Sequence, residues 1–203
     1  MMTNPRQPYF NDLAPEWDHL PAPPDAAVRI RNFVERSNAP GALRVLDVGC
    51  GTGVLLPYLL SYCGEANCVV EFDLAEAMLR VNSAKFPGGR IGRVCSDAQT
   101  LPFTDECFDL VLCFGVLPHL DEKAVAIRQI FRVMRPGGVF CVGHLMGSGE
   151  LNDLHRSLSG PVAADSLPPA DLLAESLRDL GAVDICAEEN HDWYFVRAVK
   201  AAK

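Results

Sequence analysis

Short runs of apolar residues alternate along the chain with segments of helical periodicity. Five runs carry little of the apolar–polar alternation that marks a strand with one solvated face; they lie at residues 44–48, 67–72, 92–96, 108–114 and 139–143. Apolar residues recur at helical spacing in the other segments, at 25–37, 54–63, 75–85, 122–134 and 169–180. This order predicts an α/β fold, with a doubly wound parallel sheet covered by helices on both faces.

The two ends of the chain depart from this repeat. Residues 183–187 and 194–199 have the pattern of strands separated by a charged turn, which predicts an antiparallel hairpin. Residues 1–24 hold six prolines and three aromatic residues, too many prolines for a long helix. We predict that they form an arm or lid with a short helical turn, packed against a single domain that spans residues 25–203. A short cap insertion is expected at about 145–170.

The charge balance limits the kinds of partner. Of the 203 residues, 18 are Lys or Arg and 26 are Asp or Glu, which gives a formal net charge of -8. This excess of negative charge argues against DNA, bulk RNA and anionic membrane surfaces, all of which are bound through basic side chains. With 49% hydrophobic residues, the chain can bury a sizeable core.

The eight cysteines indicate buried, reduced thiols that pack as small hydrophobic residues. No pair has the C-x-x-C spacing of a zinc site or a redox couple, so no metal site is expected. The first residues lack a basic segment followed by an apolar one, and no run approaches the ~18 apolar residues of a membrane span. These features predict a cytoplasmic protein without a membrane span.

The most informative motif is the glycine-rich turn after the first strand, which has the sequence Leu-Asp-Val-Gly-Cys-Gly-Thr-Gly over residues 46–53. A strand that runs through glycines into a helix directs backbone N–H groups at a ligand. The dinucleotide pattern G-x-G-x-x-G is not met, because Val54 or Leu56 occupies its third glycine position. Asp47 places a carboxylate beside the turn, which suits an ammonium group better than a pyrophosphate. We therefore predict a ligand that carries a cation at this turn.

Acidic residues end the next two predicted strands. Asp73 follows the last glycine by about 20 residues, the distance at which a carboxylate accepts hydrogen bonds from ribose hydroxyls. It also stands where it could cap the following helix, and Glu71 is an alternative for the ribose contact. Asp97 ends the third strand, where its carboxylate could accept a hydrogen bond from the exocyclic amine of adenine or cap a turn. The spacing of these residues indicates a nucleoside ligand.

Together these motifs resemble the class I S-adenosylmethionine-dependent methyltransferases, especially the methyltransferase-11 type that includes the ubiquinone/menaquinone-biosynthesis C-methyltransferases. The resemblance rests on the glycine turn, on Asp73, and on residues 97–103, 108–113 and 132–138, and it is strong from 43 to 143. It implies a Rossmann-like sheet of seven strands in the order 3-2-1-4-5-7-6, with strand 7 antiparallel. It also implies S-adenosyl-L-methionine as the cofactor.

The resemblance further implies roles for single residues in holding that cofactor. The methionine part would lie against Asp47 and the residues of the turn. The ribose would lie against the end of the second strand and the adenine against the end of the third. The end of the fourth strand would form part of the wall of the cleft. The residues in this order are Asp47, Gly49, Cys50, Gly51 and Gly53; Asp73 and Leu74; Asp97 and Ala98; and Cys113. Glu71 departs from the glycine or small residue that is usual at its position in the family.

Methyl transfer from a sulfonium is an in-line displacement, to which an enzyme contributes alignment and the exclusion of water. A general base is required only for an acceptor that arrives protonated. The candidates are His119, which follows the fourth strand, His144, which follows the fifth, and His155, which lies in the insertion. Each of the three could instead order its loop, so the sequence assigns no catalytic residue.

The sequence favours a small-molecule acceptor, methylated at a carbon, oxygen or sulfur atom. Amine methyltransferases of DNA bases and of protein glutamine carry Asn/Asp-Pro-Pro-Tyr/Phe after the fourth strand, whereas residues 113–116 here are Cys-Phe-Gly-Val. With the net charge of -8, this motif argues against nucleic acid as the acceptor. The alternative is a protein that binds S-adenosylmethionine or S-adenosylhomocysteine without transfer, as a sensor or a partner subunit. No motif predicts an oligomeric state.

Overall fold

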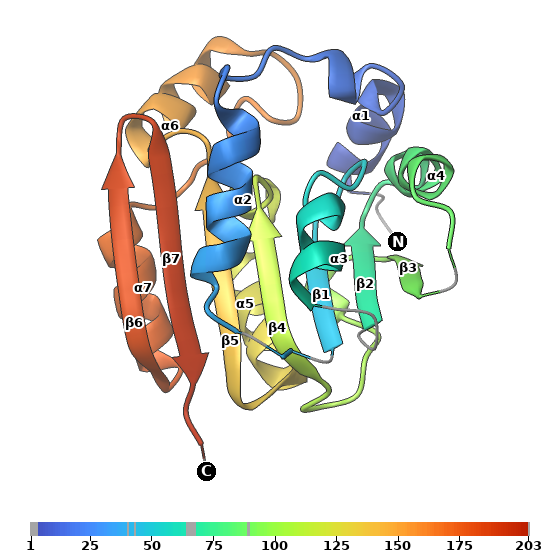
Figure 1. Cartoon of the computed structure of the whole chain (residues 1–203). Coiled ribbons are helices and arrows are strands. Elements are labelled where there is room, and N and C mark those ends of the chain that lie inside the picture. Colours follow the sequence, from blue (N-terminus) through green and yellow to red (C-terminus); the bar gives the residue numbers. More distant parts are fainter. Residues whose placement is uncertain (1–3, 40, 43, 64–67, 89, 203) are drawn as a thin grey trace.

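A mixed seven-stranded sheet forms the centre of the molecule (Figure 1), whose computed structural model describes residues 4–39, 41–42, 44–63, 68–88 and 90–202. The strands are β1 (Arg44–Val48), β2 (Cys68–Asp73), β3 (Ile91–Cys95), β4 (Phe108–Phe114), β5 (Met134–His144), β6 (Ala182–Asn190) and β7 (Trp193–Lys200). They are ordered β3-β2-β1-β4-β5-β7-β6. Strands β1 to β5 pair in parallel, and β7 is antiparallel to both β5 and β6. The predicted fold class, strand order and terminal hairpin are confirmed.

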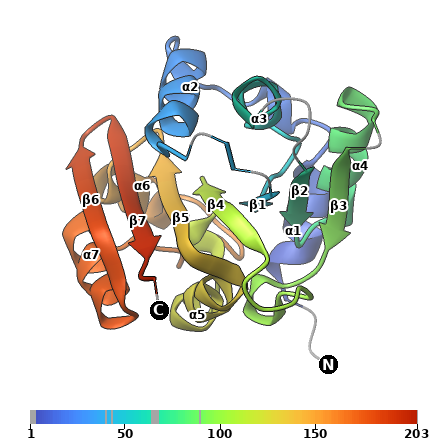
Figure 2. The ribbon, with the colours of Figure 1, turned by 60° about the horizontal axis from the view of Figure 1, so that its bottom comes forward.

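Helices cover both faces of the sheet (Figure 2), which explains why its central strands lack polar alternation. They are α1 (Arg6–Leu13), α2 (Ala26–Arg36), α3 (Leu56–Cys63), α4 (Glu76–Lys85), α5 (Lys123–Val133), α6 (Ser148–Ser157) and α7 (Ala170–Asp179). Helices α2 and α3 pack on one face, against Val45, Leu110 and Leu112. Helices α5 and α7 pack on the other, in one cluster with Leu46 and Val111. In the part of the chain described, no helix is long and apolar enough to cross a bilayer.

Two strand boundaries differ from the prediction by more than one residue. Strand β5 begins at Met134 rather than at residue 139, because Met134 pairs with Phe108 and a register shift then takes up the Pro-Gly-Gly segment. Strand β6 continues to Asn190, which pairs with Trp193, so the expected charged turn is reduced to residues 191–192. Residue 67, the expected start of the second strand, lies outside the described residues.

The cysteines are less uniformly buried than the sequence predicted. The seven whose side chains are described are all free thiols, and Cys50, Cys113 and Cys141 are buried. Cys68 and Cys95 are exposed, so the prediction of burial is wrong for them. Their places explain this, since Cys68 starts β2 and Cys95 ends β3 at the edge of the sheet. The side chain of Cys63 is outside the described set.

The N-terminal arm contains more helix than the short turn that its prolines predicted. Helix α1 has 8 residues and tolerates Pro8, because the N–H groups of a helix's first turn have no intrahelical partner. The arm packs on α4, where Phe10 and Trp17 lie against a buried cluster that contains Met78. Asn11 accepts a hydrogen bond from the backbone N–H of Ala77 at 2.9 Å, so the arm caps the first turn of α4.

Candidate active site

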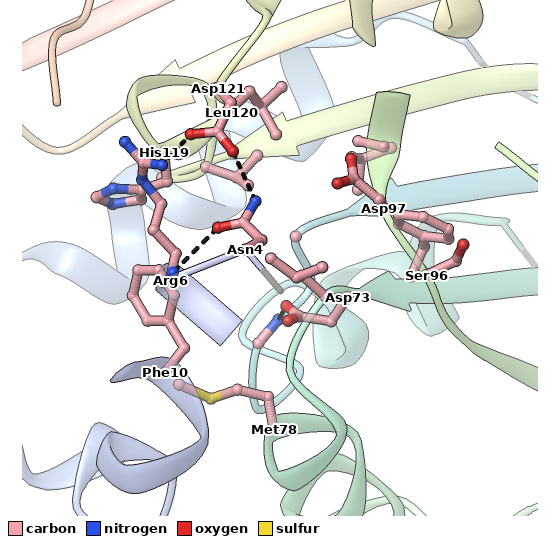
Figure 3. A pocket seen from close by; sticks show the side chains of 18 of the residues that line it. Asn4, Arg6, Phe10, Asp73, Met78, Ser96, Asp97, His119, Leu120 and Asp121 are labelled. Atoms are coloured by element: carbon pink, nitrogen blue, oxygen red, sulfur yellow. Dashed lines mark hydrogen bonds and ion pairs between the residues drawn. The ribbon is translucent and has the colours of Figure 1, made fainter. Parts of the chain in front are cut away.

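A pocket lies where the carboxyl ends of β1, β2, β3 and β4 meet, partly covered by the arm (Figure 3). Each of these four strand ends contributes to its wall, together with α4 and the arm. Asp97 and Ser96 stand on one side of the view, and His119, Arg6 and Asp121 stand on the other. This is the edge at which open parallel sheets bind ligands.

Two glycines of the turn after β1 have different functions. Gly49 has a φ of 71°, and a Cβ there would lie 2.2 Å from Cγ2 of Val116 in the loop after β4. Gly51 has a φ of 53°, and the heavy atom closest to a Cβ there is Nε1 of Trp17, at 3.8 Å. Gly49 therefore allows the turn to pack against a neighbouring loop, whereas Gly51 keeps the pocket open.

The carboxylate of Asp73 holds the turn and faces the pocket. Its Oδ2 accepts a hydrogen bond from the N–H of Gly51 and its Oδ1 accepts one from the N–H of Ala75, both at 2.8 Å. Burial raises the pKa of Asp73, and these backbone hydrogen bonds oppose the rise. An ionised carboxylate offers about four acceptor positions, so Asp73 can accept further hydrogen bonds from a ligand.

Two more carboxylates lie buried beside Asp73. Asp47 and Glu71 are opposite each other on β1 and β2 and are 1% and 0% exposed. Glu71 accepts a hydrogen bond from Nδ2 of Asn82 at 2.6 Å, whereas its Oε1 and the Oδ2 of Asp47 have no partner among the described residues. Burial raises the pKa of Asp47 well above its ordinary value and that of Glu71 to about 7. This cluster favours a cationic group near the turn.

The end of β3 forms another wall of the pocket. Asp97 accepts a hydrogen bond from the N–H of Gln99 at 2.8 Å, so it caps the short helical turn that follows. Asp97 and Ala98 both line the pocket. The two roles considered for Asp97, a cap and a ligand-facing carboxylate, are therefore compatible.

The pocket brings together part of the residue set implied by the sequence. Six of the ten proposed cofactor residues line it: Gly49, Gly51, Asp73, Leu74, Asp97 and Ala98. The other four are buried and are not in its lining: Asp47, Cys50, Gly53 and Cys113. Sequence reasoning missed Asn4, Arg6 and Asp121, which also line the pocket. No local pattern could reveal them, because Asn4 and Arg6 contact Asp121 across more than a hundred residues of chain.

The three candidate histidines lie near one another, but only His119 lines the pocket. His144 accepts a hydrogen bond from the N–H of Met146 at 3.1 Å, and burial lowers its pKa to about 4. Nδ1 of His155 lies 3.1 Å from the backbone oxygen of Asp165, and burial lowers the pKa of His155 too. His144 and His155 are therefore neutral supports behind the pocket wall at pH 7.

This strand order, with a glycine turn and two acidic strand ends on one pocket, defines the class I methyltransferase fold. The chain matches a methyltransferase domain family over residues 46–142. A demethylmenaquinone methyltransferase of Roseiflexus castenholzii is 32% identical over 169 residues, covering 72% of this chain and 70% of that protein. The chain belongs to the S-adenosylmethionine-dependent methyltransferase family.

Two further comparisons describe the extent of the likeness. A ubiquinone/menaquinone biosynthesis C-methyltransferase of Vibrio vulnificus is 35% identical over 112 residues, which cover 53% of this chain and 43% of that protein. The chain thus spans less than half the length of the first curated relatives that it matches. A SAM-dependent methyltransferase from Aquifex aeolicus superposes with a TM-score of 0.73 at 18% identity, covering 94% of this chain and 98% of that one.

The residues present fit the cofactor of this family. The Oδ2 of Asp47 has no hydrogen-bond partner among the described residues, and an ammonium group behind the turn would stabilise the ionised form of this carboxyl, which burial disfavours. The space beside Gly51 leaves room for an aliphatic chain, and Asp73 has acceptor capacity left for ribose hydroxyls. Asp97 adds an acceptor on the side where an adenine amine would lie.

Proposed function

We propose that this chain is an S-adenosylmethionine-dependent methyltransferase that acts on a small-molecule acceptor at a carbon, oxygen or sulfur atom. The observation that carries the proposal is the meeting of Gly51, Asp73 and Asp97 in one pocket, above the partnerless carboxylate oxygen of Asp47. S-adenosylmethionine supplies an electrophilic methyl group on a positively charged sulfur, so the chain has chiefly to align the two reactants and exclude water.

Each element of the site has a task in this reaction. Asp73 fixes the ribose, Asp97 and Ala98 select the adenine, and Gly51 gives the methionine part its space. Asp47, which does not line the pocket, offers a carboxyl beneath the turn whose ionised form an ammonium group would stabilise. The arm acts as a lid, since Phe10 and Trp17 of the arm line the pocket and cover part of it.

The acceptor binds beside His119, between the arm and the loop that follows β4. This proposal is supported by the apolar and aromatic side chains of that region, such as Phe10 and Leu120. The relatives named for quinone biosynthesis point to an aromatic acceptor methylated at a ring carbon.

The alternative is a binding protein that holds the cofactor without transferring its methyl group. The two functions differ in one measurement, the formation of S-adenosylhomocysteine from S-adenosylmethionine in the presence of 1,4-naphthohydroquinone, 1-naphthol or thiophenol. A methyltransferase forms S-adenosylhomocysteine and an equal amount of methylated product, both quantified by mass spectrometry. Cofactor binding in calorimetry without either product would support the sensor or partner subunit instead.

Replacing Asp73 by asparagine tests the ribose contact. The amide keeps one acceptor oxygen for the backbone but lacks the charge, so we expect S-adenosylhomocysteine to bind more weakly by about 1–3 kcal/mol in calorimetry. Glu76→Gln is the matched control, because Glu76 is a carboxylate on α4 that does not line the pocket. If the wild type and a folded Asp73→Asn variant bind S-adenosylhomocysteine with equal affinity, Asp73 does not hold the ribose.

A further inference from the structure

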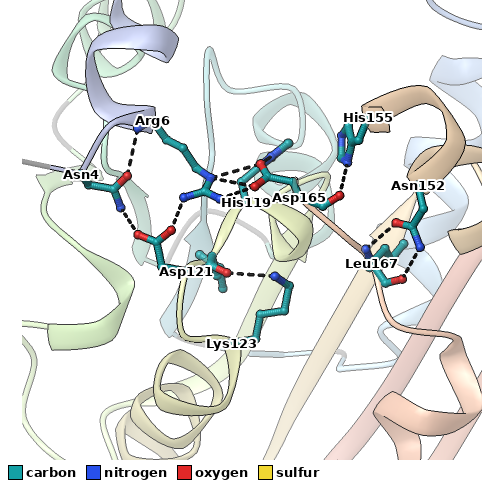
Figure 4. Close-up of polar contacts among 10 residues, drawn as sticks. Asn4, Arg6, His119, Asp121, Lys123, Asn152, His155, Asp165 and Leu167 are labelled. Carbon is teal, nitrogen blue, oxygen red and sulfur yellow. Dashed lines mark hydrogen bonds and ion pairs between the residues drawn. The ribbon is translucent and has the colours of Figure 1, made fainter. Parts of the chain in front are cut away.

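Three segments that lie far apart in the sequence meet at the carboxylate of Asp165 (Figure 4). Asp165 follows α6, and its side chain is 0% exposed. Nδ1 of His119, in the loop after β4, lies 2.6 Å from Oδ2 of Asp165. The guanidinium of Arg6, in the arm, donates from Nε to both carboxylate oxygens at 3.0 and 3.1 Å. One buried carboxylate thus holds the arm and orients a histidine.

This contact decides which nitrogen of His119 carries the proton. Burial alone would raise the pKa of Asp165, but the hydrogen bonds from His119 and Arg6 outweigh it, so the pKa lies below its ordinary value. An ionised carboxylate can only accept hydrogen bonds, which places the proton of the neutral imidazole on Nδ1. Nε2 then carries a free lone pair, and no other described residue forms a hydrogen bond with it.

The surroundings of His119 favour chemistry over a purely structural function. His119 lines the pocket. Its ring centroid lies 5.1 Å from that of Phe10 and 5.2 Å from that of His155. Asp165 is in direct contact with His119, Arg6 binds the same carboxylate, and Lys123 donates a hydrogen bond to the backbone oxygen of Leu120, the next residue along the chain. A histidine is not needed simply to connect the arm to the loop after β4, because Asp121 of that loop already binds Arg6.

We propose that His119 is the general base of the reaction, that Asp165 is its positioning residue, and that the acceptor is a phenol or hydroquinone. This inference rests on the proposed methyltransferase function. Nε2 takes the proton of the acceptor O–H, and the electron pair of that bond stays on the acceptor as an oxyanion. The oxyanion, or the ring carbon conjugated with it, then forms the bond to the methyl carbon, while the sulfur keeps the pair of the bond that breaks.

The charge on His119 is stabilised as it forms. The imidazolium donates to Asp165 through Nδ1, in the way that the buried aspartate of a serine protease stabilises its histidine. His144 and His155 face His119 as neutral rings, so they do not oppose the new charge at pH 7. Methylation at carbon gives a dienone, and the aromatic ring is restored when the ring carbon loses its proton to solvent and the oxygen takes back the proton held by His119.

The first test needs no acceptor. Long-range ¹H–¹⁵N spectra of the full chain at pH 8 report the tautomer of each histidine, and the spectrum of His119→Gln assigns the signals of His119. The inference predicts a proton on Nδ1 and an unprotonated Nε2, and loss of that preference in Asp165→Asn. A proton on Nε2 in the wild type would overturn the assignment of His119 as the base.

The second test compares transfer to 1,4-naphthohydroquinone under nitrogen between pH 6 and pH 9. A general base contributes about 100- to 10,000-fold, so His119→Gln is expected to lower kcat by that factor and to remove one ionisation from the pH profile. Asp165→Asn should lower kcat by less and move the midpoint of the same ionisation. The matched control is Asp25→Asn, which removes a carboxylate from another arginine, Arg29, outside the pocket lining, and it should keep the profile of the wild type.

The possible failures are distinguishable. If the wild type binds no S-adenosylhomocysteine, the proposed function itself is wrong. If it binds S-adenosylhomocysteine and methylates thiophenol but not the hydroquinone or 1-naphthol, the acceptor class is wrong. If His119→Gln methylates the hydroquinone at the wild-type rate with an unchanged pH profile, or if Asp165→Asn changes kcat and the pH profile no more than Asp25→Asn does, the base and its positioning residue are wrong.

Discussion

Valine in place of Gly51 is expected to block the cofactor while the chain remains folded. The new side chain would extend into the pocket, where the heavy atom closest to its Cβ is Nε1 of Trp17 at 3.8 Å. Overpacking of this kind costs about 1–3 kcal/mol or more, which corresponds to a dissociation constant roughly 10- to 100-fold higher or beyond. Calorimetry with S-adenosylhomocysteine measures this loss directly.

Two other glycines separate blocked binding from backbone strain. Gly181 has a φ of 82° and nothing within 4 Å of its Cβ position, and it lies outside the pocket lining, so Gly181→Val carries comparable strain but should bind normally. Gly49→Ala should instead lower the melting temperature, because the Cβ of the new alanine would lie 2.2 Å from Cγ2 of Val116. Normal binding by a folded Gly51→Val variant would show that the cofactor does not lie beside this turn.

Glu71→Gln is expected to remove a large pH-dependent loss of stability. The pKa of Glu71 is raised from its ordinary 4.5 to about 7 in the folded chain. Between these pH values the folded chain keeps a proton that the unfolded chain releases, so the free energy of unfolding falls as pH rises through this window. Since one pKa unit is worth about 1.4 kcal/mol, the loss amounts to roughly 3 kcal/mol and is complete near pH 7.

Urea unfolding at pH 4.5 and pH 8 measures this effect. Between these pH values the free energy of unfolding should fall by about 3 kcal/mol more in the wild type than in Glu71→Gln. The glutamine side chain has the same shape as glutamate but cannot ionise. Glu76→Gln, which removes an exposed carboxylate of the neighbouring helix, should behave like the wild type. Equal losses in the wild type and Glu71→Gln would mean that Glu71 titrates in the folded chain as it does in water.

The parts of the site that depend on strand order could be predicted from the sequence. Asp73 and Asp97 were identifiable because each follows an apolar strand, and parallel strands end at one edge of a sheet. Gly51 was identifiable because a strand, a glycine turn and a helix follow one another directly. These features are local in sequence, so they can be identified without knowledge of side-chain packing.

The features that depend on distant contacts could not be predicted. Arg6 and Asp165 lie 159 residues apart, and neither stands in a motif. His119 was one of three candidates until the structure placed it on the pocket and beside Asp165. The exposure of Cys95 depends on its position at the end of the edge strand β3, and the place of a strand in the sheet cannot be told from the residues of that strand.

A crystal structure of the chain with S-adenosylhomocysteine would show directly whether this pocket holds the cofactor. The account predicts the ribose hydroxyls within hydrogen-bond distance of Asp73, the adenine amine beside Asp97, and the amino-acid part over Gly51. It is contradicted if the nucleoside lies elsewhere on the molecule, or if it occupies this pocket with neither aspartate in contact.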